Sequence, residues 1–179
     1  MMMLNEKLFY FLNSFAGRSA FLDSVIVFIG NDLPFILIGF TLVYFIFIKR
    51  SARRLALLSF TTLFAALITE VLKWAVFRHP RPFAALTDVV QLIQITAFDS
   101  FPSQHATIFA ALATGMFIYY RSVGVWYIVL AVLIGIARIM AGIHYPLDIL
   151  TGFLIGFLVT YLSYRLLRKL LNSVRNYIS

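Results

Sequence analysis

The chain has 179 residues, of which 62% are hydrophobic and only 12% are charged. Soluble domains carry about 25% charged residues, so this composition excludes an ordinary soluble fold, and the lack of cysteine excludes disulfides and thiol nucleophiles. The net charge is +8, from 15 basic and 7 acidic residues. Because the basic residues lie between long apolar runs, the charge indicates membrane topology, and we expect no nucleic-acid partner.

The N-terminal region is predicted to lie along the membrane surface. Residues 4–29 form one or two short amphipathic segments in this interpretation, and residues 30–34 (GNDLP) form a break before the first membrane span. Two alternatives stay open. The first span, Leu33–Ile48, can extend back toward Leu22 with Pro34 bending the helix, or residues 4–29 can add a sixth span.

Five apolar stretches predict an all-α fold, a polytopic bundle of membrane-spanning helices. A crossing takes roughly 20 residues, and the first stretch is shorter than the other four. The five are Leu33–Ile48, Leu55–Phe77, Pro102–Tyr120, Gly124–Gly142 and Leu147–Leu167. We expect one integral membrane domain over residues 1–179, with an interfacial segment over 1–29 and a transmembrane core over 33–167.

The basic residues predict the orientation of the bundle. With five spans, nine of them fall on one side, which should be the cytoplasm, and the seven acidic residues fall at or near the other. The nine are Lys49, Arg50, Arg53, Arg54, Arg121, Arg165, Arg168, Lys169 and Arg175. We therefore expect a multi-pass protein of the plasma membrane, with the long 78–101 loop outside the cell.

Polar residues gather at the outer ends of the predicted spans, in three strings of the chain. These are KWAVFRHPRPF (73–83), DSFPSQHAT (99–107) and ARIMAGIHYPLD (137–148), and together they hold all three histidines. Charged groups at membrane depth are costly, so their convergence at one level indicates a functional site.

Some of the cations have a structural explanation when taken singly. Arg78 and Arg81 suit an anchor at the lipid headgroups. Lys73 lies one turn from Glu70, at the spacing of a helical ion pair. A structural role and a functional role therefore both stay open for these residues.

The second string combines helix-start residues with a histidine. Ser103 suits a helix cap, although Ser100 or Asp99 already fits that position before Pro102. A lone His105 is more often a polar residue with its hydrogen bonds satisfied than a catalyst. A functional interpretation of these residues therefore depends on the third string.

The third string contains the sharpest signal, a histidine four residues before an aspartate. Pro146 suits the first turn of a helix, so Asp148 can reach back to His144, fix its tautomer and raise its basicity. Cations, two histidines and a helix N-terminus together predict a site for a tetrahedral anion. A neutral histidine can attack phosphorus while a second one protonates the leaving oxygen.

The same residues say little in favour of a metal. No carboxylate cluster suggests magnesium or calcium. Two histidines and one aspartate are an alternative zinc site, but the nearby cations argue against it. We expect neither a metal nor a cofactor.

At these residues the sequence resembles the type 2 phosphatidic acid phosphatase superfamily of membrane lipid phosphatases. The family has three motifs: Lys-x6-Arg-Pro, Pro-Ser-Gly-His and Ser-Arg-x5-His-x3-Asp. Their order and the spans between them match over roughly residues 20–168, and the third motif has the family spacing from Arg138 through His144 to Asp148.

The resemblance implies a role for each matching residue. His144 is the nucleophile that forms a phosphohistidine, Asp148 orients it, and His105 protonates the leaving group and then activates water. The implied ligands of the phosphoryl oxygens are Lys73, Arg81, Arg138, Ser103 and the backbone N–H of Gln104. Family members need no metal.

Three departures from the family pattern stand out. Seven residues, not six, separate Lys73 from Arg81, so Arg78 is an alternative ligand. Gln104 replaces the usual glycine, which keeps the backbone donor and adds a side chain. Ala137 replaces the serine before the motif arginine.

Within the superfamily, the small size and the strings PRPF, SFPSQHAT and RIMAGIHYPLD are most similar to bacterial undecaprenyl-diphosphate phosphatases. The resemblance implies a membrane lipid substrate, dephosphorylated on the outer face of the bilayer, and no protein partner is indicated. The first alternative is a phosphatidylglycerophosphate or phosphatidic acid phosphatase. A protein that binds anionic lipid without catalysis is a more distant one.

Overall fold

The computed structural model describes residues 4–76 and 79–178 of the chain. In this described part all regular secondary structure is helical, which confirms the predicted all-α class. Four helical stretches are long and apolar enough to cross a membrane: Ala20–Ile48, Ala52–Ala75, Arg121–Met140 and Pro146–Lys169. The protein is therefore a multi-pass membrane protein.

The first of these stretches corrects the prediction for the N-terminal region. Helices α2 (Ala20–Val27) and α3 (Leu33–Val43) are joined by a π-helical turn, η1 (Phe28–Asp32), and a second such turn, η2 (Tyr44–Ile48), follows α3. The helix therefore runs through residues 30–34. The expected break is wrong, and the alternative of a first span that extends back toward Leu22 with Pro34 inside the helix is confirmed. A proline inside a helix removes a donor and crowds the preceding turn, and the wider π-turn accommodates it.

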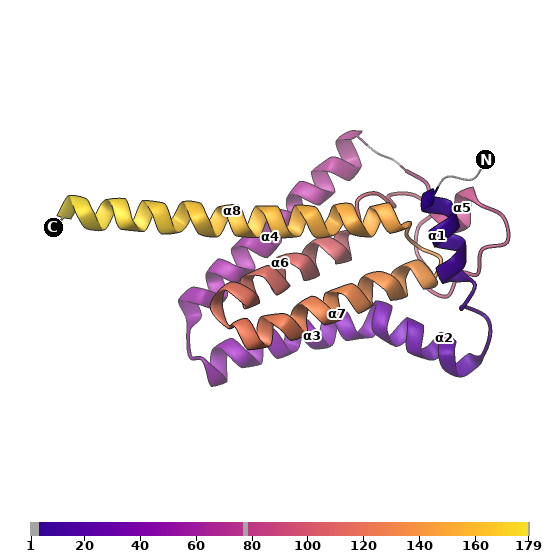
Figure 1. Cartoon of the computed structure of the whole chain (residues 1–179), viewed down its shortest axis with the longest axis horizontal. Coiled ribbons are helices and arrows are strands. Elements are labelled where there is room, and N and C mark those ends of the chain that lie inside the picture. The colour runs from indigo at the N-terminus through magenta and orange to yellow at the C-terminus, as the bar shows by residue number, and fades with distance from the viewer. Residues whose placement is uncertain (1–3, 77–78, 179) are drawn as a thin grey trace.

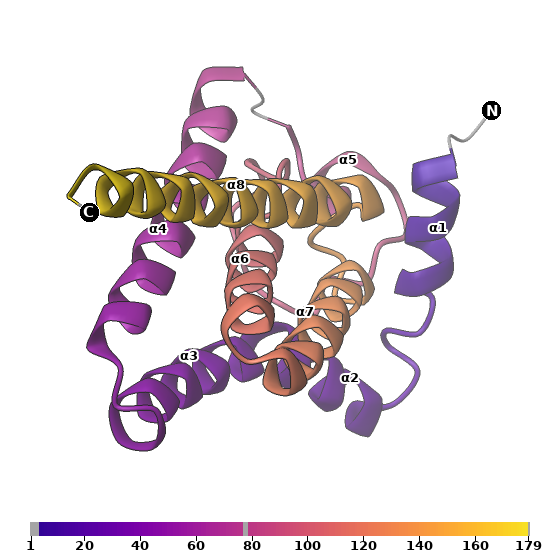
Figure 2. The ribbon, with the colours of Figure 1, turned by 60° about the vertical axis from the view of Figure 1, so that its left-hand side comes forward.

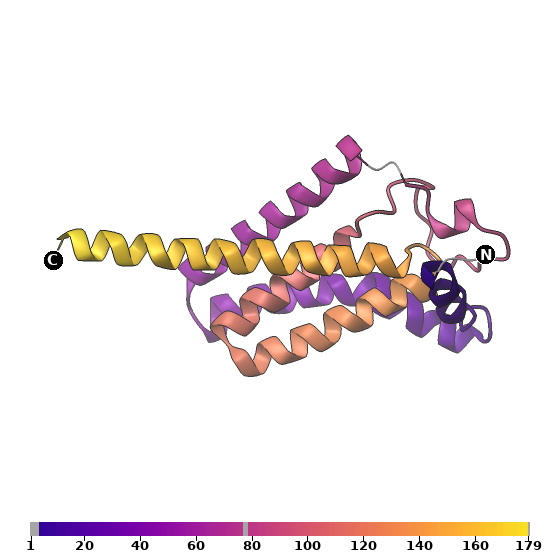
Figure 3. The same ribbon diagram turned by 45° about the horizontal axis from the view of Figure 1, so that its top comes forward.

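Within residues 4–29, α1 (Leu4–Asn13) is a helix of its own, distinct from the long helical stretch Ala20–Ile48. It lies across the end of the bundle where α8 begins (Figures 1 and 3). Its last residue, Asn13, is buried. Asn13 Nδ2 donates to the backbone oxygens of Val90 and Met140, both at 2.8 Å, and its Oδ1 accepts from the Val90 N–H. This side chain joins α1 to the 86–101 loop and to the end of α7.

The remaining helices are α4 (Ala52–Val76), the short α5 (Pro82–Ala85), α6 (Gln104–Tyr119), α7 (Arg121–Met140) and α8 (Pro146–Ile178). Helix α6 begins two residues later than predicted and is shorter than a typical span. It is the central helix, because it packs against α4, α7 and α8 and most of its residues are buried. Figure 2 shows α4 crossing behind α8, while α6 lies beside α7.

Two glycines allow α8 to approach α6 closely. A Cβ atom at Gly152 would lie 2.6 Å from the Ser103 carbonyl oxygen, and one at Gly156 would collide with the carbonyl of Thr107. Small residues four positions apart are a common way to bring membrane helices into backbone contact. This contact places the start of α8 beside the start of α6.

The two ends of the bundle differ in chemical character. The α3–α4 and α6–α7 connections lie at one end, and the 79–101 loop, α1 and α5 lie at the other (Figure 1). At the first end Arg54 Nη1 donates to the Tyr120 hydroxyl at 2.8 Å, and the Lys49 ammonium lies 4.9 Å from the centre of the same ring. The predicted site residues that the structure describes belong to the second end.

Candidate active site

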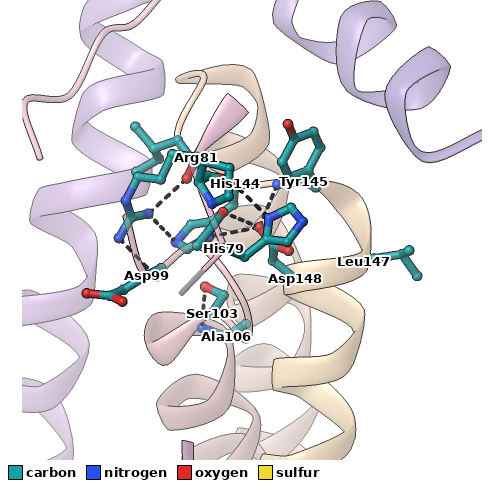
Figure 4. Close-up of polar contacts among 12 residues, drawn as sticks. His79, Arg81, Asp99, Ser103, Ala106, His144, Tyr145, Leu147 and Asp148 are labelled. Atoms are coloured by element: carbon teal, nitrogen blue, oxygen red, sulfur yellow. Dashed lines mark hydrogen bonds and ion pairs between the residues drawn. The ribbon is translucent and has the colours of Figure 1, made fainter. Parts of the chain in front are cut away.

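Connections and helix ends meet at the second end of the bundle and bring predicted residues together. Figure 4 shows four of them there: Arg81, Ser103, His144 and Asp148. His144 lies in the connection between α7 and α8, and Asp148 is in the first turn of α8. Arg81 precedes α5, and Arg138 is in the last turn of α7. The start of α6 supplies Ser103, Gln104 and His105.

The predicted contact between His144 and Asp148 is present. His144 is 2% exposed, and its Nδ1 lies 3.4 Å from Asp148 Oδ2. Because a carboxylate only accepts, it selects the tautomer with the proton on Nδ1. The lone pair of the histidine is then on Nε2, on the other side of the ring.

The carboxylate of Asp148 has two further donors. Its Oδ2 accepts from the Ser100 hydroxyl at 2.5 Å and from the Tyr145 backbone N–H at 2.9 Å. From the sequence Ser100 was predicted only as a possible helix cap, and its contact with Asp148 was not predicted. The two residues are 48 positions apart, and no local pattern signals the pairing.

Arg81 faces the other nitrogen of His144. Its Nε donates to the Thr96 carbonyl and its Nη1 to the Ile143 carbonyl, both at 2.9 Å, so the side chain is held by backbone. The same Nη1 lies 3.2 Å from His144 Nε2. A guanidinium only donates, so Nε2 is the acceptor, in agreement with the tautomer that Asp148 selects.

Electrostatics keep His144 uncharged. Burial lowers the pKa of His144 to about 4, the Arg138 and Arg81 cations also lower it, and Asp148 opposes them. The imidazole is therefore neutral near neutral pH. A neutral, oriented imidazole surrounded by cations is suited to attack an electrophile that arrives with negative charge.

The start of α6 differs from the prediction in its cap. Ser103, rather than Ser100 or Asp99, is the N-cap, and its hydroxyl accepts from the Ala106 N–H. The backbone of Ser103 is extended and its N–H donates to the Asp148 carbonyl at 3.0 Å, so Ser103 flanks the helix, which begins at Gln104. The first N–H groups of a helix have no acceptor within it and attract anions.

The side chains that follow the cap point to different neighbours. Gln104 Nε2 donates to the Ala66 carbonyl on α4 at 3.2 Å, so the added side chain links two helices. His105 is half-buried and lies within electrostatic range of His144, Arg138 and Lys73. The second histidine therefore shares one site with the first.

The remaining cations have different surroundings. Lys73 is buried on α4 with its Nζ 3.7 Å from Glu70 Oε2, so the ion pair considered as an alternative is present. Its contact with a phosphate stays a prediction. Arg138 is 2% exposed, and its Nη1 donates to the Gly30 carbonyl at 2.9 Å. Arg78, the other possible ligand of the first motif, lies outside the described residues.

These groups define a buried cationic site with an oriented, neutral histidine at the end of a membrane helix bundle. Within residues 4–76 and 79–178, no cluster of three or more His, Asp or Glu side chains could hold a metal ion. The chain belongs to the PAP2 superfamily, whose sequence model matches residues 54–171. It is a lipid phosphatase of that superfamily.

The chain is similar to characterised proteins over most of its length. It is 31% identical to the undecaprenyl-diphosphatase BcrC of Bacillus subtilis, over 85% of this chain and 78% of that protein. It is 30% identical to the bacitracin transport permease protein BcrC of Bacillus licheniformis, over 85% and 75%. The crystal structure of Aquifex aeolicus LpxE superposes with a TM-score of 0.77 at 28% identity, covering 92% of this chain and 96% of that one.

Proposed function

We propose that this phosphatase removes the terminal phosphate of undecaprenyl diphosphate and leaves undecaprenyl phosphate in the membrane. The observation that supports the reaction is the pair of contacts on His144, with Asp148 on Nδ1 and Arg81 beside Nε2. The similarity to the Bacillus subtilis undecaprenyl-diphosphatase supports the substrate.

The reaction proceeds in two displacements at phosphorus. The anionic headgroup binds with His105 protonated, because its negative charge offsets the surrounding cations. His144 Nε2 attacks the terminal phosphorus, the bond from that phosphorus to the bridging oxygen breaks, and His105 gives its proton to the departing oxygen. His105 then takes a proton from water, which attacks the phosphohistidine and breaks the bond between phosphorus and nitrogen. Inorganic phosphate leaves, and both histidines return to their starting states.

The charges of the site match the electron flow. Arg81 moves from His144 Nε2 onto a phosphoryl oxygen when substrate binds, which frees the lone pair for attack. Arg138, Lys73, the Ser103 hydroxyl and the Gln104 N–H bind the other oxygens and stabilise the added negative charge. We expect metal-independent turnover, because cations of the chain supply this stabilisation, and inhibition by vanadate as a mimic of five-coordinate phosphorus.

We place the site at the extracytoplasmic face of the plasma membrane. The positively charged connections at the opposite end of the bundle support this orientation. A diphosphate headgroup would then reach the site while its tail stays in the bilayer. The chain has no cysteine, so Thr87→Cys and Ser51→Cys provide single labels. An impermeant thiol reagent on intact cells should label the first, and labelling of only the second would contradict the orientation.

A substrate panel on detergent-purified protein tests the proposed function. Phosphate release is measured with undecaprenyl diphosphate, phosphatidylglycerophosphate and phosphatidic acid, in the presence of EDTA, with His144→Ala as the inactive control. We expect undecaprenyl diphosphate to have the highest kcat/KM. A higher kcat/KM for either phospholipid would show that this phospholipid, and not undecaprenyl diphosphate, is the preferred substrate. Strict dependence of turnover on added Mg²⁺ would overturn the mechanism.

A further inference from the structure

The partner of Arg138 comes from a helix that contains none of the three motifs. Arg138 Nη1 donates to the carbonyl of Gly30, in the π-helical turn η1. Gly30 and Arg138 are both buried, and they are 108 positions apart. The turn precedes the segment that the family model matches, residues 54–171. A residue of the cationic site therefore depends on a part of the chain outside that segment.

Pro34 explains why this carbonyl is available. In an α-helix the Gly30 oxygen would accept from the N–H of the residue four positions later, and that residue is Pro34, which has no N–H. One position earlier, the Leu33 N–H donates to the Phe28 carbonyl, five residues back, which widens the turn. The helix thus leaves one carbonyl without its α-helical donor at the level where Arg138 ends α7.

The bond to Gly30 orients the Arg138 side chain and leaves another donor of the guanidinium available. Arg138 Nε is buried and has no hydrogen-bond partner among the described residues. Burying an unpaired donor is costly, and an anionic oxygen is the partner that a guanidinium prefers. His105 and His144 both lie within electrostatic range of Arg138. The bond to Gly30 therefore holds one edge of the guanidinium, while Nε stays available for a ligand.

We propose that Pro34 is a positioning residue for the phosphate site. By withholding an N–H from the helix, it dedicates the Gly30 carbonyl to Arg138 and holds the guanidinium ready to bind phosphoryl oxygens. Preorganised donors do not have to reorient when charge develops, which is the main electrostatic advantage of an active site. The inference rests on the role of Arg138 given under Proposed function.

Replacing Pro34 with alanine separates positioning from folding. Pro34→Ala supplies an N–H that can donate to Gly30, so that the turn can close as an α-helix and the Gly30 carbonyl turns along the helix axis, away from Arg138. Alanine is far better than proline inside a helix, so we expect the Tm to stay equal or rise. We expect vanadate affinity and kcat/KM to fall about tenfold, the usual scale for one charge-assisted hydrogen bond.

Two further variants are matched controls. Gly39→Ala lies in the same helix, also improves helix propensity, and would place its Cβ where no atom lies within 4 Å. It should leave vanadate affinity unchanged. Pro34→Gly also supplies the N–H, but glycine is a weak helix former. It should reproduce the loss of affinity without a rise in Tm.

Vanadate affinity, measured by calorimetry, does not require the lipid to be known. If the wild type binds vanadate but hydrolyses none of the three lipids, the proposed substrate fails and the Pro34 series still decides the present inference. Wild-type vanadate affinity in Pro34→Ala would overturn the inference.

A Tm that falls together with vanadate affinity in both Pro34 variants would also overturn the inference, because the proline would then support folding alone. In an Arg138→Ala background Pro34→Ala should have no effect, and a further tenfold loss there would also overturn the inference.

Discussion

The α6–α8 pair and the long N-terminal helix, Ala20–Ile48, support the same site in opposite ways. The pair places the side chains that we propose to be catalytic at the starts of two helices, and glycines bring those starts together. The N-terminal helix offers one backbone carbonyl, and it does so through a distorted turn. Asp148 orients His144 from within the same short motif, whereas the bond that orients Arg138 comes from backbone 108 positions away.

The largest effect is expected from the substitution that removes the proposed nucleophile itself. His144→Ala should lower phosphate release by at least about a thousandfold, because a covalent nucleophile has no substitute at this position. The protein should still insert and fold, since the helices of the bundle are unchanged. Size-exclusion chromatography in detergent checks folding. Retention of more than about a tenth of wild-type turnover would contradict the assignment of the nucleophile.

The second prediction concerns a substitution that separates α6 from α8 and leaves the proposed catalytic side chains in place. Gly156→Leu inserts a side chain where even a Cβ would collide with the Thr107 carbonyl, so α8 must move away from α6. Overpacking of this kind costs about 1–3 kcal/mol, and we expect a lower Tm and about a hundredfold loss of kcat/KM, the scale of a small misplacement of catalytic groups.

Gly39→Leu is the matched control for the helix pair, because nothing lies within 4 Å of a Cβ at that position. It should leave both Tm and kcat/KM near wild-type values. If Gly156→Leu behaves like this control, the close contact of the two helices is not what aligns His144 with His105.

The third prediction concerns the residue that the sequence analysis missed. Ser100→Ala removes one of the donors to Asp148 Oδ2 and leaves the donors from His144 and Tyr145. Hydrogen bonds to a charged group contribute about 1.5–3 kcal/mol, so kcat should fall at least about tenfold with little change in KM. Ser100→Thr keeps the hydroxyl and should retain most of the activity. Equal activity of the alanine and threonine variants would show that this donor does not orient the pair.

The parts of the site that sequence predicted are those whose partners lie nearby along the chain. His144 and Asp148 are four residues apart, so the geometry of a loop followed by a helix dictates their contact. The long apolar runs likewise predicted a bundle of membrane helices, which the structure confirms.

The errors have one physical cause, because each depends on a tertiary partner. Residues 30–34 contain glycine, asparagine and proline, which favour a break when considered locally, yet packing against α7 and the bond to Arg138 maintain the helix there. The cap at Ser103 lies where the chain is bonded to α8, through the Ser103 N–H and the Asp148 carbonyl. Propensity describes the isolated segment, and tertiary contacts override it.

The smallest expected effect is a pair of opposite shifts in the pKa of His144. The native value of about 4 lies below the ordinary 6.5, with burial as the largest cause, so folding stability is lost as pH falls from 6.5 toward 4 and this group takes up a proton. Arg81→Gln removes a cation that lowers the pKa and should raise it, while leaving it below 6.5 because the burial remains. Asp148→Asn removes the carboxylate that opposes burial and should lower it. Titration of ¹⁵N-histidine signals in detergent measures both shifts, with His79→Gln and His105→Gln for assignment. A higher His144 pKa in Asp148→Asn, or a lower one in Arg81→Gln, would contradict the contacts of Asp148 with Nδ1 and of Arg81 with Nε2.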